Sequence, residues 1–189
     1  MQQNVLDLFE NMRYNNGGIM YPRKGMPMER VSKHNYYLDI AQTVASRGTC
    51  LRRSFGAIIV QNDSILATGY NGAPRGRKNC CDLGYCMREK LEIPRGERYE
   101  LCRSVHAEAN AIIAAGRESM IGATLYMTCI DPATHQVVGG VSSCAMCKRM
   151  VINAGIKTVI VREDAQHYTE YPVQNWIDCD DSLSGVFGY

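Results

Sequence analysis

The chain of 189 residues has the length of one ordinary domain, and its 46% hydrophobic and 21% charged residues are typical of a globular protein. Its 21 basic and 19 acidic side chains give a formal net charge of +2, far from the basic excess that drives non-specific binding to nucleic acids. No apolar run approaches the ~18 residues needed to span a bilayer, and the first residues lack the regions of a signal peptide. We therefore expect a cytoplasmic protein without a membrane segment and without a nucleic acid partner.

The spacing of apolar residues in the first half of the chain predicts a helix followed by a β-hairpin. The helical pattern begins at Val31 and ends near Gly48. The short apolar runs 55–60 and 64–70 then predict the two strands of the hairpin. Residues 71–103 show no sustained period, and such a long loop in a compact domain is usually functional or tied down.

The second half of the chain predicts strands that alternate with helices. We expect two helices, over 105–115 and 144–154, and two strands, over 123–129 and 158–161. Gly116 and Gly155 are expected to end the two helices. This order predicts a layered α/β fold in which the hairpin is antiparallel and the later strands are joined by crossovers.

Nine cysteines are many for a chain of this length, and in a reducing compartment they indicate metal binding or chemistry more than disulfides. Cys144 and Cys147 lie three residues apart at the start of a predicted helix, so both sulfur atoms face one point. The backbone N–H groups of that first turn stabilise thiolates, which zinc requires of its ligands. By itself, this C-x-x-C pair is equally compatible with a redox dithiol or with two small buried residues.

His106 and Glu108 open the other predicted helix and indicate a catalytic metal site. One imidazole and two thiolates form a Cys2His donor set, which leaves the fourth tetrahedral position of zinc open for water. Glu108, two residues after His106, need not bind the metal and can shuttle the proton of that water. The alternative from a different class, a non-catalytic zinc scaffold or nucleic-acid-binding module, has no use for a carboxylate beside an open zinc position.

Residues 31–163 resemble the deoxycytidylate (dCMP) deaminases of the cytidine deaminase-like superfamily. The resemblance is carried by the segments RGTCLRRSFGAIIV, GYNGAPRG, NCCD, HAEANAII and CKRMVINAGIKTVIV, in that order. It implies a three-layer α/β/α sandwich with a mixed central sheet. We expect the deaminase domain to cover 31–165, between an irregular N-terminal arm (1–30) and an acidic C-terminal tail (166–189) that packs through Trp176 or on a neighbouring chain.

The resemblance also implies an activity, the hydrolytic deamination of dCMP to dUMP and ammonia. It makes His106, Cys144 and Cys147 the zinc ligands, Glu108 the proton shuttle and Asn71 a group that hydrogen-bonds the nucleotide. Alternative substrates are dCTP, a modified cytosine nucleotide or an adenosine in RNA. The near-neutral charge and the GYNGAPRG segment argue against RNA.

The chain departs from the family pattern at two positions. The family usually has proline before the first cysteine of the C-x-x-C pair, whereas Ser143 stands here and can cap the helix instead. In addition, residues 130–143 separate the strand from Cys144, where the usual connection is only a few residues. We expect this insertion to form a small hairpin near the mouth of the pocket, where it can alter substrate preference.

The cysteines in the middle of the chain could hold a second, structural zinc. Cys81, Cys86 and Cys102 are the best candidates, because the adjacent Cys80 and Cys81 cannot easily share one ion. Such a metal would order the long loop. The alternative is that these cysteines are reduced and partly buried.

Several cations could bind the phosphate of a nucleotide or an effector: Arg52, Arg53, Arg75, Arg77, Lys78 and Arg117. Arg75 and Lys78 follow the GYNG segment and are therefore expected nearer the pocket. Arg117 shares a helical face with His106 but lies ~16 Å further along the axis, so it could serve a phosphate but not the base. The resemblance implies a homo-oligomer, commonly a hexamer, activated by dCTP with a divalent ion such as Mg²⁺ and inhibited by dTTP. For each single arginine, a solvated position on the surface is the alternative.

Overall fold

The computed structural model describes residues 12–14, 20–22, 30–94 and 96–179, and the chain divides into two compact units, 1–32 and 33–189. In the first unit, strand β1 (Met12–Tyr14) pairs antiparallel with strand β2 (Met20–Pro22). Two short paired strands therefore lie in the segment where the sequence predicts an irregular arm. The rest of that arm, and residues 180–189 of the predicted tail, lie outside the described residues.

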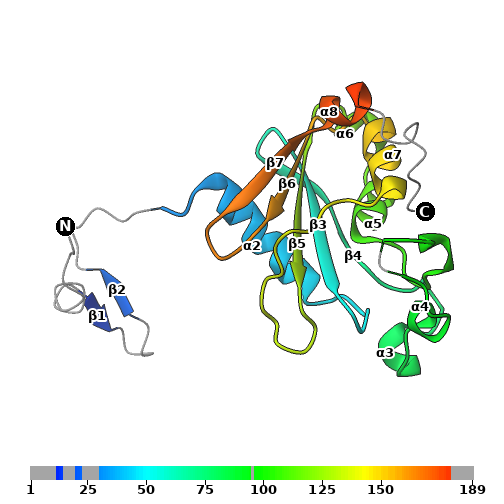
Figure 1. Cartoon of the computed structure of the whole chain (residues 1–189). Coiled ribbons are helices and arrows are strands. Elements are labelled where there is room, and N and C mark those ends of the chain that lie inside the picture. The colour runs from blue at the N-terminus through cyan, green and yellow to red at the C-terminus, as the bar shows by residue number, and fades with distance from the viewer. Residues whose placement is uncertain (1–11, 15–19, 23–29, 95, 180–189) are drawn as a thin grey trace. The chain divides into compact units, whose positions relative to one another are not determined.

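The second unit is built on a five-stranded sheet with the strand order β4-β3-β5-β6-β7 (Figure 1). Strands β5 and β6 pair in parallel, whereas β3–β4, β3–β5 and β6–β7 are antiparallel. The prediction of a mixed central sheet is confirmed. The five strands are β3 (Ser54–Gln61), β4 (Ser64–Tyr70), β5 (Thr124–Ile130), β6 (Thr158–Arg162) and β7 (Tyr168–Pro172).

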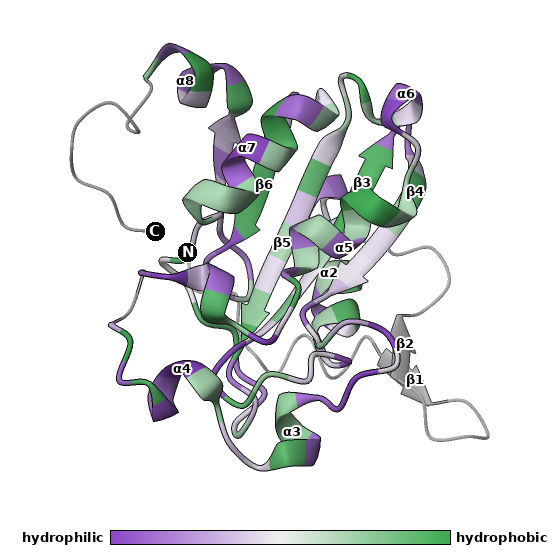
Figure 2. Cartoon of the chain, turned by 90° about the vertical axis from the view of Figure 1, so that its right-hand side faces the viewer, coloured by the Kyte–Doolittle hydropathy of each residue, from purple (hydrophilic) through white to green (hydrophobic). Residues whose placement is uncertain are grey.

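Helices cover both faces of this sheet and complete the predicted three-layer α/β/α sandwich. Helix α2 (Lys33–Ala45) packs on one face, and helices α5 (Ala107–Ala114) and α7 (Ala145–Ala154) pack on the other (Figures 1 and 2). None of the helices among the described residues has the length and apolar character to cross a bilayer. The remaining helices are short: α3 (Cys80–Leu83), α4 (Met87–Lys90), η1 (Tyr99–Leu101), α6 (Arg117–Met120) and α8 (Val173–Asp178).

Strand β3 shows why the sequence folds in this way. Ala57 and Ile59 belong to the core under α5 and α7, while Ile58 and Val60 belong to the core under α2. Because both faces of the strand are buried, its sequence is a continuous apolar run without alternation. The edge strand β4 is half exposed, as its mixed polar and apolar sequence requires.

Two glycines let helices approach the sheet directly. A Cβ atom on Gly56 would lie 2.1 Å from the backbone oxygen of Ala41 in α2. On the other face, a Cβ on Gly69 would lie 2.3 Å from the oxygen of Ala107 and 2.4 Å from the nitrogen of Ala111, both in α5. No side chain fits in either gap, so the backbones of α2 and α5 rest on the backbones of β3 and β4.

The C-terminal ends of helices α5 and α7 test the prediction that glycines end both helices. Helix α7 ends at Gly155, which adopts the left-handed conformation (φ 77°) as expected. Helix α5 ends earlier, at Ala114, and Gly116 has an ordinary φ of −85° and precedes α6. The prediction that Gly116 ends α5 is therefore wrong, because a second short helix begins there.

The boundary expected after residue 165 also differs from the structure. Strand β7 pairs with β6 over its whole length, from Thr158–Pro172 to Arg162–Tyr168, and α8 follows it. Tyr171 and Trp176 pack against the core under α5 and α7. Residues 168–178 thus belong to the sheet domain. The acidic composition of the C-terminal region gives no sign of the edge strand β7, whose side chains are partly buried.

Candidate active site

The N-terminal ends of α5 and α7 bring three metal-ligating side chains together. His106 is the residue before α5, Cys144 is the residue before α7, and Cys147 lies in the first turn of α7. The Nδ1 atom of His106 lies 3.5 Å from Sγ of Cys144 and 3.4 Å from Sγ of Cys147. Within residues 30–94 and 96–179, this is the one group of three such side chains whose ligand atoms converge, all within 4.8 Å of one another.

These separations fit a zinc ion. With Zn–N bonds of about 2.0–2.1 Å, Zn–S bonds of about 2.3 Å and tetrahedral angles, nitrogen and sulfur ligands stand about 3.5–3.6 Å apart. The two observed N–S separations agree with this value to within ~0.2 Å, the tolerance expected of a metal site. Three protein ligands leave one tetrahedral position open, which is the pattern of a catalytic site.

Without metal, the pKa of each of the three ligands depends on hydrogen bonds with the other ligands. A hydrogen bond from Cys147 stabilises the Cys144 thiolate and lowers the pKa of Cys144 to about 4, while the same bond and burial raise the pKa of Cys147. Burial acts to lower the pKa of His106, but hydrogen bonds with Cys102 and Cys144 outweigh it and raise that pKa to about 10. Zinc binding must therefore displace protons from Cys147 and His106.

Glu108 lies beside the cluster and is not one of its three ligands. Its side chain is only 4% exposed, and this burial raises the pKa of the carboxyl group despite the opposing charge of His106. The carboxyl group also interacts with the thiol of Cys147. A buried carboxyl group with a raised pKa can both accept and donate a proton near neutral pH.

A second layer of side chains supports His106 from the long loop. The ring of Tyr99 meets the His106 ring edge to face, with centroids 5.1 Å apart. The guanidinium of Arg88 lies over the Tyr99 ring at 4.5 Å and donates hydrogen bonds to the backbone oxygens of Pro94 and Glu97. The sequence predicts neither Arg88 nor Tyr99, because a loop without periodicity gives no signal of which side chains turn inward.

Asn71 lies buried at the end of β4 and holds the start of β3. Its Oδ1 accepts a hydrogen bond from the backbone N–H of Phe55 at 2.9 Å, and its Nδ2 donates to the backbone oxygen of Arg53 at 2.8 Å. Both polar atoms of the side chain are thus engaged by the protein. The expected hydrogen bond from Asn71 to a nucleotide is a prediction that would have to use a second hydrogen or lone pair of this amide.

The predicted phosphate-binding cations lie in different surroundings. Arg52 pairs with Glu89 of α4 at 3.2 Å, and Arg53 pairs with Asp131 at 3.1 Å. Arg75 and Lys78 are exposed in the loop after β4. Arg117 is not brought to the site: its Nε donates to the backbone oxygen of Asn153, roughly 13 Å along α7 from Cys144.

The predicted second metal set does not converge. Cys81 is exposed, and its thiol faces Asp82 at 3.7 Å. The preceding residue, Cys80, is the buried one, because it is the first residue of α3 and faces the body of the domain. Cys81, Cys86 and Cys102 therefore form no three-ligand group in the described part of the chain.

The insertion between β5 and α7 forms a small hairpin, as the sequence predicts. Ile130 and Val137 form an antiparallel bridge, and the Asp131 carboxylate accepts hydrogen bonds from the backbone N–H groups of Ala133 and Thr134. The ion pair of Asp131 with Arg53 fixes this hairpin to the start of β3.

Comparison with known proteins agrees with this site. Residues 31–163 match the family described as the cytidine and deoxycytidylate deaminase zinc-binding region. The chain belongs to this family of zinc-binding deaminases, and the resemblance found in its sequence is confirmed.

Individual relatives narrow the comparison further. The chain is 34% identical to the deoxycytidylate deaminase of Mycobacterium phage D29 over 143 residues, which cover 73% of this chain and 100% of that protein. It is 33% identical to the deoxycytidylate deaminase of Schizosaccharomyces pombe over 131 residues, covering 69% of this chain but only 37% of that longer protein.

Solved structures show the same fold. A dCMP deaminase from the cyanophage S-TIM5, in complex with dCMP and dUMP, aligns with a TM-score of 0.52 and 28% identity over 82% of this chain and 95% of that one. A cytidine deaminase from Burkholderia pseudomallei aligns with a TM-score of 0.50 at 15% identity, over 76% and 95% of the two chains, and shares the fold.

Proposed function

We propose that this chain is a zinc-dependent deaminase that hydrolyses dCMP to dUMP and ammonia. The observation that carries the proposal is the Cys2His cluster with one open position and the buried carboxyl group of Glu108 beside it. Further support comes from the relatives, which are named deoxycytidylate deaminases, and from the similar cyanophage enzyme that binds dCMP and dUMP.

His106, Cys144 and Cys147 would hold the zinc ion, which when bound acts as a Lewis acid and makes water nucleophilic at neutral pH. Glu108 takes a proton from the attacking water and delivers it to N3 of the pyrimidine. The same carboxyl group then takes the second proton, from the hydroxyl group added at C4, and delivers it to the amine as the C4–N bond breaks, so that one water and one dCMP give one dUMP and one ammonia. Burial of Glu108 keeps bulk water from competing for these protons.

The decisive experiment measures ammonia release by the zinc-loaded protein from dCMP, dCTP, CMP, deoxycytidine and RNA. We expect dCMP to give the highest kcat/KM. The variant Glu108→Gln should keep its zinc and its fold and lose ~10² or more in rate, because an amide cannot shuttle the proton. Turnover near the wild-type rate in that variant would show that another group moves the proton, and no ammonia from any cytosine substrate would refute the deaminase assignment.

We also propose a second, structural metal, with Cys80 in place of Cys81. Burial raises the pKa of the Cys80 thiol, and the thiols of Cys50, Cys102 and Cys86 raise it further. In the described part of the chain these sulfur atoms do not converge as the catalytic ligands do, so a metal would have to draw three of them together. These side chains belong to the segment before β3, to α3, to the start of α4 and to the segment before His106. A metal held by three or four of them would fix the long loop next to the active site.

Assembly and regulation complete the proposal. We infer a cytoplasmic homo-oligomer, with a hexamer favoured, that responds to dCTP with Mg²⁺ and to dTTP. Ile113 on α5 is 72% exposed and Ile121 is 51% exposed, which supports burial of these side chains by another copy of the chain. Light scattering with and without the two triphosphates measures both the assembly and the response.

A further inference from the structure

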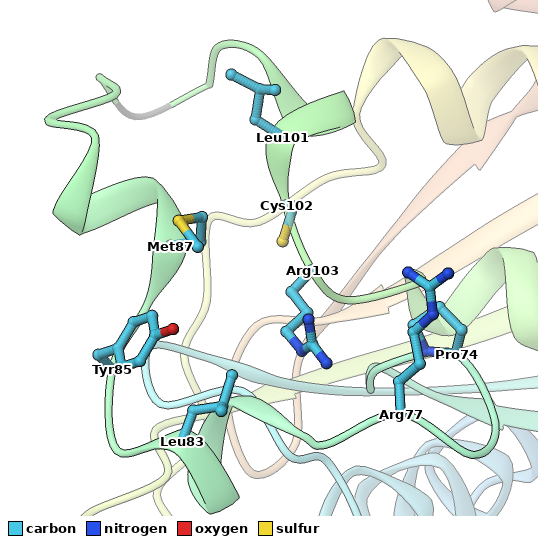
Figure 3. A pocket seen from close by; sticks show the side chains of 8 residues that line it. All are labelled: Pro74, Arg77, Leu83, Tyr85, Met87, Leu101, Cys102 and Arg103. Carbon is cyan, nitrogen blue, oxygen red and sulfur yellow. The ribbon is translucent and has the colours of Figure 1, made fainter.

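A cavity of about 260 Å³ lies in the long loop, residues 71–103, that precedes the metal ligand His106 (Figure 3). Its walls come from the segment after β4, from α3 and α4, and from the residues before His106. Leu83, Tyr85 and Met87 form an apolar side of the cavity, and Cys102 and two arginines also line it.

One side chain, that of Cys102, neighbours both this cavity and a ligand of the catalytic metal cluster. Cys102 lines the cavity, and its thiol interacts electrostatically with the imidazole of His106. Tyr99, three residues before Cys102, packs edge to face against the same imidazole. The cavity therefore adjoins the metal cluster on the side of His106.

The charge of the cavity has one sign. Two guanidinium groups line it, those of Arg77 and Arg103, and no Asp or Glu side chain is among the described residues of its wall. In Figure 3, Arg77 lies beside Pro74, and Arg103 lies between Arg77 and the apolar side chains of Leu83, Tyr85 and Met87. An anionic group in the cavity would be attracted by these two arginines, and no carboxylate of the described wall would repel it.

The two arginines are held in different ways. Nε of Arg103 donates a 2.6 Å hydrogen bond to the backbone oxygen of Lys78, which fixes the plane of the guanidinium and leaves its terminal nitrogens for a ligand. The Arg77 side chain makes no hydrogen bond or ion pair with any residue in the described part of the chain, so it is available to a ligand. Arg75 and Lys78, by contrast, contribute nothing to the cavity wall.

We propose that Arg77 and Arg103 bind the 5′-phosphate of the nucleotide substrate and so make the enzyme select nucleotides over free nucleosides. This inference rests on the deaminase function proposed above. It assigns the phosphate to Arg77, which is one of the cations that the sequence offers, and to Arg103, which is not, in place of Arg75 and Lys78. Guanidinium groups suit this role because their paired N–H donors match two phosphate oxygens.

The test compares ligands that differ only in the phosphate. Calorimetry measures binding of dUMP and of deoxyuridine to the zinc-loaded full chain, and ammonia release measures kcat/KM for dCMP and for deoxycytidine. Arg77→Gln and Arg103→Gln should each weaken dUMP binding and lower kcat/KM for dCMP by roughly 10- to 100-fold, the scale of one charge-assisted contact. Deoxyuridine binding and deoxycytidine turnover should change less than about twofold.

Arg75→Gln is the matched control, because it removes an exposed arginine two residues from Arg77. It should leave the preference for dUMP over deoxyuridine intact. Since Arg103 also supports the loop through Lys78, zinc content and thermal unfolding are measured for every variant, and Arg77→Gln remains a test if Arg103→Gln fails to fold.

Three results would overturn the proposal: equal affinity of the wild type for dUMP and deoxyuridine, an unchanged dUMP preference in Arg77→Gln, or loss of that preference in Arg75→Gln alone. If the wild type releases no ammonia but binds dUMP through Arg77, the phosphate site stands and the proposed reaction fails. The two proposals are thus separated by binding and turnover measured on the same protein.

Discussion

Replacing Gly69 by alanine should weaken zinc binding indirectly, because this glycine sets the distance between helix α5 and the sheet. The new Cβ would lie 2.3 Å from the oxygen of Ala107 and 2.4 Å from the nitrogen of Ala111. Both are backbone atoms of α5 and cannot rotate away. To reach ordinary van der Waals separation, α5 must move off β4 by roughly 1 Å.

This displacement should lower both the stability of the fold and the affinity for zinc. Overpacking of this kind lowers the free energy of unfolding by about 1–3 kcal/mol. His106 precedes α5 directly and moves with it, whereas Cys144 and Cys147 stay with α7. Since zinc sites tolerate only ~0.2 Å of error in ligand distance, a shift of this size should reduce zinc affinity at least about tenfold.

Gly56→Ala provides the control, since its Cβ would clash with the backbone of α2, which carries none of the site residues. Urea unfolding measures the stability of both variants, and zinc retained against a graded series of chelators measures metal affinity. Both variants should lose stability, and only Gly69→Ala should lose zinc and ammonia release. Full zinc content and wild-type kcat/KM in Gly69→Ala would refute the link between helix height and metal geometry.

Three further predictions concern single side chains. Cys147→Ala should lose the catalytic zinc, measured by elemental analysis, and full retention would remove this cysteine from the ligand set. Fresh reduced protein should contain two zinc ions per chain, and Cys80→Ser should reduce this to one while Cys81→Ser keeps two; one zinc in the wild type would count against the second metal. Burial raises the pKa of Tyr126 to about 12, so the neutral phenol stabilises the folded state below pH ~10 and this contribution is lost as pH rises from ~10 to 12. Tyr126→Phe should therefore flatten the fall in thermal stability over that range, and an equally steep fall in the variant would show that other groups cause it.

The central part of the site can be predicted because its signals are local. His106, Glu108, Cys144 and Cys147 each lie at the start of a helix, where the apolar spacing of the following residues fixes both the position and the direction of a side chain. The expected cap by Ser143 is wrong, because Cys144 is itself the N-cap residue of α7 and no side chain caps that helix. The sheet is predictable for a related reason, since β3 and the parallel strands are apolar runs of typical length between turn residues.

The loop around the site cannot be predicted in the same way. In residues 71–103 no period states which side chains face inward, so the sequence favours Cys81 although Cys80 is buried, and Arg75 although Arg77 lines the cavity. Strand β7 is not predicted, because a short edge strand of polar and aromatic residues around one charge, Glu170, has the composition of a surface segment. The burial of the loop side chains and the pairing of β7 depend on contacts with distant parts of the chain, which the local sequence does not indicate.

The ligands of the metal come from the ends of rigid helices, while the loop cavity and the inserted hairpin come from the connections that lead into those helices. The chemistry and the choice of substrate are therefore carried by separate parts of the chain. Residues 131–141 can be exchanged for the corresponding segment of a relative while the anchoring of α5 and α7 on the sheet stays unchanged. An exchange of residues 84–101 would have to keep Arg88 and Tyr99, which support His106. The fold is accordingly suited to engineering by loop exchange, in which one deaminating centre is given access to different molecules.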